Sequence, residues 1–184
     1  MARRPALVNE RGFTLAELLV ASAVLGLLMM GVFTVQRQGL GAYQIGAARA
    51  EVQQNARAAL ETMFGELRTA REITAVPGAC GTGPVPTGGG ATSISFNDQN
   101  LAPLQYQLVG SELRRNGVAL IGGVQNLRIW CYNAAGALTA TANQVATVHV
   151  QVSTRTESVV AATSDRNQHA FMETRVQLRN LPNP

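Results

Sequence analysis

The longest apolar stretch of the chain runs from Phe13 to Val35, and its only formal charge is Glu17. A membrane core about 30 Å thick is crossed by roughly 20 apolar residues in an α-helix. This stretch therefore predicts a helix that can span a membrane, with a transmembrane segment over residues 13–36. The short head before it carries three arginines. By the positive-inside rule, this head stays in the cytoplasm and the bulk of the chain lies outside.

The pattern after the apolar stretch predicts an amphipathic continuation of the helix over residues 37–75. No proline occurs between Pro5 and Pro77. Apolar residues recur at steps of three and four, as on one face of a helix that packs under a sheet: Val52, Ala56, Ala59, Leu60, Met63, Leu67 and Ala70. Helical spacing holds to about Ile73.

Three glycines interrupt this helix near the predicted outer membrane face. Gly39, Gly41 and Gly46 each cost roughly 1 kcal/mol relative to alanine in a helix interior. We expect a bend or a locally melted segment around residues 37–46.

Residues 76–184 have the turn and strand patterns of an antiparallel sheet. The segment 77–90, rich in glycine and proline, has no apolar period and lacks the Gly-Lys-Ser/Thr ending of a phosphate-binding loop, so it is interpreted as a linker. Gly110-Ser111 fits a two-residue type II′ hairpin, and Asn116-Gly117 supplies another turn. Strands are predicted at Thr92 to Asn97, Leu104 to Val109, Glu112 to Arg115, Val118 to Leu120, Leu127 to Tyr132, Val145 to Thr156 and Phe171 to Arg179. The fold class is α+β, with one long helix laid on an antiparallel sheet.

The junction before the apolar stretch resembles a known processing signal. The run Gly12-Phe13-Thr14-Leu15-Ala16-Glu17-Leu18-Leu19-Val20-Ala21 is similar to the cleavage and methylation signal of type IV prepilins and type II secretion pseudopilins. The resemblance implies a leader over residues 1–12, cleavage between Gly12 and Phe13 by prepilin peptidase, and methylation of the Phe13 amine by the same peptidase/methyltransferase. It also implies a role in assembly for Glu17.

Glu17 has two physical interpretations. It can pair with the cationic Phe13 amine of a neighbouring subunit, which neutralises a carboxylate that would be costly at membrane depth and sets the axial register of the subunits. Alternatively, Thr14-x-x-Glu17 is a capping box that satisfies backbone N–H groups at the helix start. The first interpretation is favoured because a capping box alone does not explain the Arg-Gly-Phe junction.

The second half of the chain resembles a narrower group, the W-type minor pilins (PilW-like) and the J-type minor pseudopilins. The resemblance rests on Leu104 to Leu108, Glu112 to Arg115, Gly123 to Ile129 and Thr174 to Asn180. Two departures from major pilins favour a minor subunit. The apolar run lacks a late proline, and the two cysteines do not bracket a C-terminal loop.

Cys80 and Cys131 are the two cysteines of the chain. In an exported domain such a pair most often forms a disulfide, which would stabilise by roughly 4 kcal/mol through loop closure and pin the 77–90 segment to the sheet. A reactive or metal-binding pair is the alternative, but no CxxC motif is present and the two histidines do not have ligand spacing.

The sequence gives little support to catalysis, and no cofactor or metal is expected. No Gly-x-Ser-x-Gly or His-Glu-x-x-His motif is present. His149 is expected to be exposed on the polar side of its strand, and His169 to lie in a polar surface turn with Asp165, Arg166 and Asn167.

The resulting prediction is a non-enzymatic structural subunit of a type IV pilus-like filament or its tip complex, first inserted in the inner membrane and later at the cell surface or in the periplasm. Expected partners are the prepilin peptidase, other major and minor pilins, the inner-membrane assembly platform and membrane lipid. A minor pseudopilin of type II secretion and a signal-anchored exported domain are alternatives. An ordinary secretory signal is disfavoured, because the apolar region of such a signal spans only 7–15 residues and the stretch from Phe13 to Val35 is longer.

A DNA-binding tip subunit is a further alternative. Arg114, Arg115 and Arg128 are the candidate contacts. The aromatic residues that could stack on bases are few: Tyr106, Trp130 and Tyr132. The net charge of +4 falls to +2 on removal of the leader, so the mature chain is nearly balanced.

Overall fold

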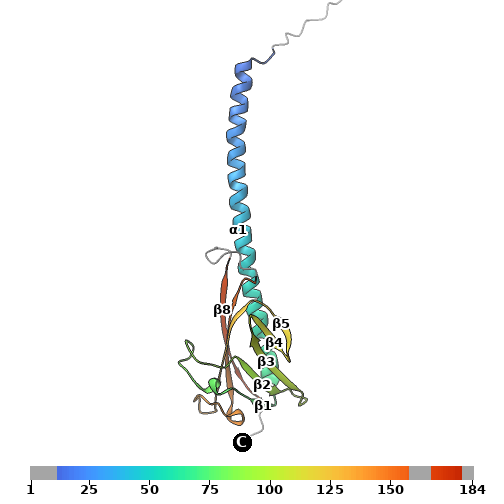
Figure 1. The fold of residues 1–184 in the computed structure, drawn as a ribbon, viewed down its shortest axis with the longest axis vertical. Helices are drawn as coiled ribbons and strands as arrows, with labels where there is room; N and C mark the ends of the chain where they lie inside the picture. Colours follow the sequence, from blue (N-terminus) through green and yellow to red (C-terminus); the bar gives the residue numbers. More distant parts are fainter. Residues whose placement is uncertain (1–11, 158–166, 180–184) are drawn as a thin grey trace, which may run out of the picture. The chain divides into compact units, whose positions relative to one another are not determined.

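The computed structural model describes residues 12–157 and 167–179 (Figure 1). The chain divides into two compact units, residues 1–43 and residues 44–184. A single helix, α1 (Leu15–Thr69), contributes to both units. Residues 37–46 are α-helical throughout, so the predicted local melting is wrong. Unlike proline, glycine keeps its backbone N–H and can still make the helical hydrogen bonds. The cost of roughly 1 kcal/mol for each glycine is therefore not enough to end the helix.

The first unit contains the apolar part of α1. The most apolar part of this helix is not buried within the chain at all. By length and composition the helix can cross a membrane, as the sequence predicts. Its apolar side chains have no cover from the described part of the chain itself.

The second unit begins with the amphipathic part of α1. The seven apolar positions predicted to face the core are all buried. The helix ends at Thr69, however, and β1 (Glu72–Ala75) follows, so the prediction of helix to residue 75 is wrong. Ile73 pairs with Phe96 of the next strand, and the N–H of Arg71 donates to the Asn97 carbonyl at 2.9 Å. Sheet pairing with a distant strand replaces the last helical turn.

The first sheet is an antiparallel meander in the order β1-β2-β3-β4-β5. Its further strands are β2 (Ser93–Asn97), β3 (Pro103–Val109), β4 (Glu112–Arg115) and β5 (Val118–Ile121). Val109 pairs with Glu112 across the predicted two-residue hairpin, where Gly110 has a φ of 62°. The Asn116-Gly117 turn has positive φ at both residues, 50° and 80°, which is the pattern of a type I′ turn.

A second sheet contains β6 (Val124–Tyr132), β7 (Thr147–Arg155) and β8 (His169–Gln177), paired antiparallel in that order. The expectation of one sheet is therefore corrected to two. The chain leaves the first sheet at Gly122-Gly123, where Gly123 has a φ of 69° that favours glycine. Two short helices, η1 (Gly78–Gly81) and η2 (Ala142–Gln144), lie in the connections.

One core joins both sheets and the second half of α1. Its largest fully buried members include Tyr106, Phe96, Met63 and Leu67. The Phe96 and Tyr106 rings stack with centroids 6.2 Å apart. The Thr154 hydroxyl donates to the buried carbonyl of Val52 at 2.7 Å, which ties β7 to the helix. The sheets are thus fixed to α1 by both apolar and polar contacts.

Candidate processing and assembly site

The helix starts immediately after the predicted cleavage point. Gly12, Phe13 and Thr14 have no regular secondary structure, and α1 begins at Leu15. The Phe13 side chain is 88% exposed. A Cβ atom added at Gly12 would meet no atom within 4 Å. Nothing in the described part of the chain therefore requires glycine at position 12, and any requirement for a small residue has to come from an enzyme that binds there.

Thr14 and Glu17 form a reciprocal capping box at this helix start. The Thr14 N–H and hydroxyl both donate to Glu17 Oε2 at 2.9 Å, and the Glu17 N–H donates to Thr14 Oγ1 at 3.2 Å. Two N–H groups at the helix start are thereby satisfied. The second carboxylate oxygen, Oε1, accepts no hydrogen bond from any residue in the described ranges. The carboxylate thus caps its own helix and keeps one oxygen for an outside donor.

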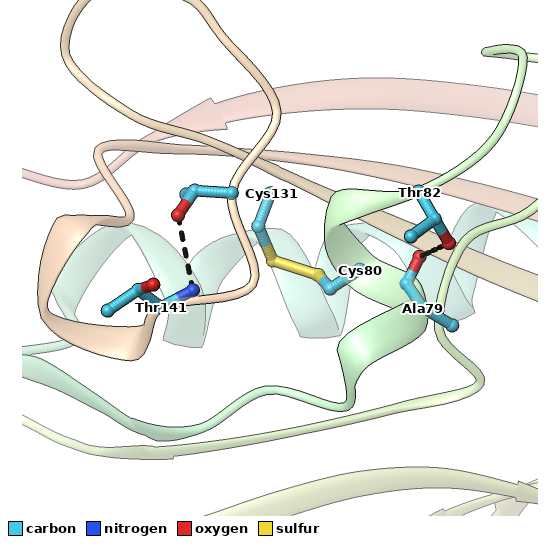
Figure 2. Close-up of a disulfide and its surroundings, with 6 residues drawn as sticks. Ala79, Cys80, Thr82, Cys131 and Thr141 are labelled. Carbon is cyan, nitrogen blue, oxygen red and sulfur yellow. Dashed lines mark hydrogen bonds between the residues drawn. A yellow bond between two sulfur atoms is a disulfide. The ribbon is translucent and has the colours of Figure 1, made fainter.

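A disulfide joins Cys80 in η1 to Cys131 in β6 (Figure 2). The Cα atoms are 5.3 Å apart, and both residues are completely buried. The sequence-based disulfide prediction is confirmed. Because both sulfurs are bonded to each other within the core, the alternative of a reactive or metal-binding thiol pair is wrong for this structure.

The 77–90 segment is more than a linker, because its second half covers the outer face of the second sheet. Arg128 Nη1 donates to the carbonyls of Pro86 and Thr87 at 3.3 and 2.8 Å. Gln151 Nε2 donates to the same Pro86 carbonyl at 3.2 Å. A Cβ atom on Gly90 would lie 3.0 Å from the Trp130 ring. The disulfide and these hydrogen bonds hold the two ends of the segment against the sheet.

His149 is buried, so the prediction that His149 is exposed is wrong. The residue is 3% exposed, and its ring centroid is 5.2 Å from that of Trp130. Its Nε2 lies 3.4 Å from Glu173 Oε2, whereas Nδ1 has no hydrogen-bond partner among the described residues. Burial lowers the pKa of His149; Glu173 opposes this shift, and the nearby Arg175 adds to it.

His169 is the first residue of β8, and its Nδ1 lies 3.1 Å from Gln125 Oε1. The predicted turn around it falls largely on residues 158–166, which lie outside the described residues. The strand position of His169 corrects the expectation of a loop.

The candidate nucleic-acid contacts lie on two different sheets and bind acceptors of the chain itself. Arg114 pairs with Glu112 at 2.9 Å, and Arg115 pairs with Glu66 of α1 at 2.9 Å, both from β4. Arg128 lies on β6, where it binds the covering segment. These contacts give no support for a single cationic patch formed by the three arginines.

The proposed stacking residues are mostly inaccessible. Tyr106 and Trp130 are completely buried. The Tyr106 hydroxyl donates to Glu66 Oε2 at 2.6 Å, and burial, followed by this contact, raises the pKa of Tyr106. Tyr132 is half-buried beneath Arg175, whose guanidinium carbon is 5.5 Å from the ring centroid. DNA binding stays a prediction without a preformed site to support it.

Comparison with known protein families supports the interpretation of the N-terminal segment. Residues 7–33 match the family model described as the prokaryotic N-terminal methylation motif. The N-terminal segment of the chain is therefore prepilin-like. This match includes the Gly12–Phe13 junction, the capping box and most of the apolar part of α1. No curated protein and no solved structure matches the chain.

For a prepilin-like chain, the motif implies processing by prepilin peptidase and assembly with other pilins. The long apolar helix and the motif together indicate a membrane-anchored pilin or pseudopilin. A long N-terminal helix packed on antiparallel sheets is consistent with a pilin fold. The motif also favours a structural subunit over an enzyme.

Proposed function

We propose that this chain is a minor pilin, a structural subunit that prepilin peptidase cleaves between Gly12 and Phe13 and that then joins a type IV pilus-like filament or its tip complex. The observation that carries the proposal is the methylation motif over residues 7–33, with the cleavage point in a non-helical segment directly before an apolar helix. The precursor spans the inner membrane once, with the second unit outside the cytoplasm.

The capping box supports both the processing and the assembly steps. Cleavage turns the Phe13 nitrogen into an amine, but the bond between Phe13 and Thr14 remains an amide. The Thr14 N–H therefore still binds Glu17 Oε2 in the mature chain. The helix start is stabilised before and after cleavage by the same two side chains.

The mature N-terminus then carries a charge that requires a partner. A cationic Phe13 amine at the positive end of the helix dipole is unfavourable within one subunit. Glu17 Oε1, which accepts no hydrogen bond from the described chain, is available to the Phe13 amine of a neighbouring subunit. Pairing would remove two unfavourable charges from the apolar environment and would fix the axial register between subunits.

The position of the disulfide supports a minor subunit. Cys131 is in β6, and the chain continues for two more strands after it, so the bond does not enclose a C-terminal loop. Together with the resemblance to W-type chains, this favours a role in filament priming or at the tip, in motility, adhesion or DNA uptake. The alternative is a J-type minor pseudopilin of type II secretion, because the same sequence segments resemble that group.

Intact mass and N-terminal sequence of the membrane-extracted chain test the class. Expressed with prepilin peptidase, the chain should start at Phe13 and carry one added methyl group. Expressed without the peptidase, it should start at Met1. A start at Met1 in both cases, or beyond the apolar stretch, would overturn the proposal.

Deletion of the gene tests the machine in which the subunit works. Loss of surface pili with normal protein secretion would support the minor pilin. Loss of secretion with normal piliation would replace it with the pseudopilin alternative.

A further inference from the structure

Four strands lie at the ends of the two sheets: β1 and β5 in the first, and β6 and β8 in the second. In the described ranges, β5 pairs only with β4, and β8 pairs only with β7. Figure 1 shows these two edge strands on opposite sides of the second part of α1. An unpaired edge presents backbone N–H and C=O groups that can pair with another strand.

The edge at β5 has no charged side chain and no proline to oppose such pairing. The strand is short, with the four residues Val118-Ala119-Leu120-Ile121, and its pairing with β4 shifts register between Leu113 and Arg114. Val118 is 71% exposed and Leu120 is 41% exposed. Soluble proteins generally protect an edge with charges, proline or a covering element. An exposed apolar edge is consistent with a strand that is covered in an assembly.

An apolar groove lies beside β8. It has a volume of about 290 Å³ and is lined by Arg57, Leu60, Glu61 and Phe64 of α1 with Met172 and Thr174 of β8. Leu60, Phe64 and Met172 are its apolar lining residues, and Arg57 and Glu61 form an exposed ion pair with atoms 2.6 Å apart. A strand added to the free edge of β8 would extend the second sheet over this groove.

Val118 has the orientation that such a strand requires. It pairs with Arg115, and residues directly opposite each other in an antiparallel pair point to the same face. Arg115 points toward α1, because it binds Glu66 at 2.9 Å. Val118 is therefore on the helix side of its sheet. Met172 and Thr174 are likewise on the helix side of theirs, since both line the groove with α1.

The strand directions also match. β5 starts beside Arg115, at the level of Glu66 on α1, and leads to Gly123, whose carbonyl accepts from the Arg155 N–H at 2.8 Å. Arg155 is the last residue of β7 and pairs with His169, the first residue of β8. β5 therefore runs toward the end of the second sheet at which β8 begins. In two chains of the same orientation, β5 of one and β8 of the other are antiparallel.

We propose that β5 of one copy adds to the free edge of β8 in a second copy, with Val118 seated in the groove of Leu60, Phe64 and Met172. The contact is head-to-tail, because the two surfaces differ and lie on opposite sides of the helix, so each copy can bind two neighbours. Main-chain hydrogen bonds supply the pairing, and the groove supplies specificity for an apolar side chain. The proposal depends on the proposed function in one respect: anchoring in the same membrane gives the two chains the same orientation.

Cysteine cross-linking of the full chain in lipid vesicles tests this contact. The two native cysteines are joined in the core, so an engineered cysteine supplies the free thiol. Val118→Cys chains are mixed with Met172→Cys or Thr174→Cys chains and oxidised mildly. One of these mixtures should give a dimer several-fold above two control mixtures, in which the second chain carries Glu173→Cys, on the opposite face of β8, or Leu101→Cys, at an exposed site elsewhere.

The outcomes separate the alternatives. Dimers between two Val118→Cys chains in excess of mixed dimers would overturn the head-to-tail contact in favour of a two-fold one. If mixed dimers are no more abundant than in the mixtures with Glu173→Cys or Leu101→Cys, the pairing of β5 with β8 is overturned. Trp130 emission checks that each variant is folded. N-terminal processing is read separately by mass, so a failure of cross-linking does not count against the proposed function.

Discussion

Breaking the bond between Cys80 and Cys131 should destabilise the second unit strongly. The bond closes a loop with a sequence separation of 51 residues. In the chain-entropy model, a loop of this length contributes about 4 kcal/mol to the free energy of unfolding. Single domains have a total stability of roughly 5–15 kcal/mol. Reduction should therefore remove a large share of the stability of this unit.

Reduction is a cleaner perturbation than substitution. Both cysteines are completely buried, and the reduced thiols stay in the core, so no cavity is created. The main change is in the unfolded chain, which regains the freedom that the loop had lost. The covering segment also loses its covalent tether at Cys80, although Arg128 and Gln151 still bind its Pro86 carbonyl.

The assay is urea unfolding of the detergent-solubilised chain, followed by tryptophan emission. Trp130 is the only tryptophan and is completely buried in the second unit, so the signal reports that unit alone. With a urea m-value of about 2 kcal/mol/M, reduction should lower the midpoint by roughly 2 M. The Cys80→Ala/Cys131→Ala variant is the control, since its midpoint should not respond to the reductant. A loss below about 1 kcal/mol on reduction would refute the loop-closure argument.

Three further predictions concern the helix start and the buried histidine. Gly12→Phe should trap the full precursor, whereas Gly12→Ala should leave partial processing by immunoblot; normal maturation of the Phe variant would contradict the peptidase assignment. Glu17→Ala should be cleaved normally but reach filaments at a fraction of the wild-type level, since the Phe13 amine loses its partner; equal recovery in sheared filaments would defeat the pairing. Burial lowers the pKa of His149 below 6.5, so its neutral form contributes stability above pH 6.5 that is lost as the pH falls through the lowered value. His149→Gln should flatten the acid side of the Tm profile, the exposed His169→Gln should not, and identical profiles for both variants would exclude His149 as the cause.

Local patterns were sufficient for most of the elements. The helix face at Val52, Met63 and Leu67 follows from a period of 3.6 residues, and the strands follow from a period of two. The turns at Gly110 and Asn116-Gly117 depend on residues that accept positive φ. These signals depend only on neighbouring residues, so they can be recognised in the sequence without knowledge of long-range contacts.

Predictions that depended on distant partners were less successful. Glu72–Ala75 continues the helical pattern, but its backbone pairs with β2 instead. His149 alternates with Val148 and Val150 as an exposed residue would, yet it is buried, with its ring beside that of Trp130. The cationic residues Arg115 and Arg128 have the composition of a nucleic-acid contact, but each binds an acceptor far away in the sequence.

The sequence by itself determined the membrane-length helix, the prepilin-like motif around Gly12 and Phe13 and the α+β class. Each of these depends on hydropathy, local spacing or a contiguous motif. Only the tertiary structure decided the split into two sheets at Gly122-Gly123, the burial of His149 and the positions of β5 and β8 at the ends of their sheets. The physical reason is that burial and strand pairing are properties of segments brought together from tens of residues apart, and no local period records which segments will meet.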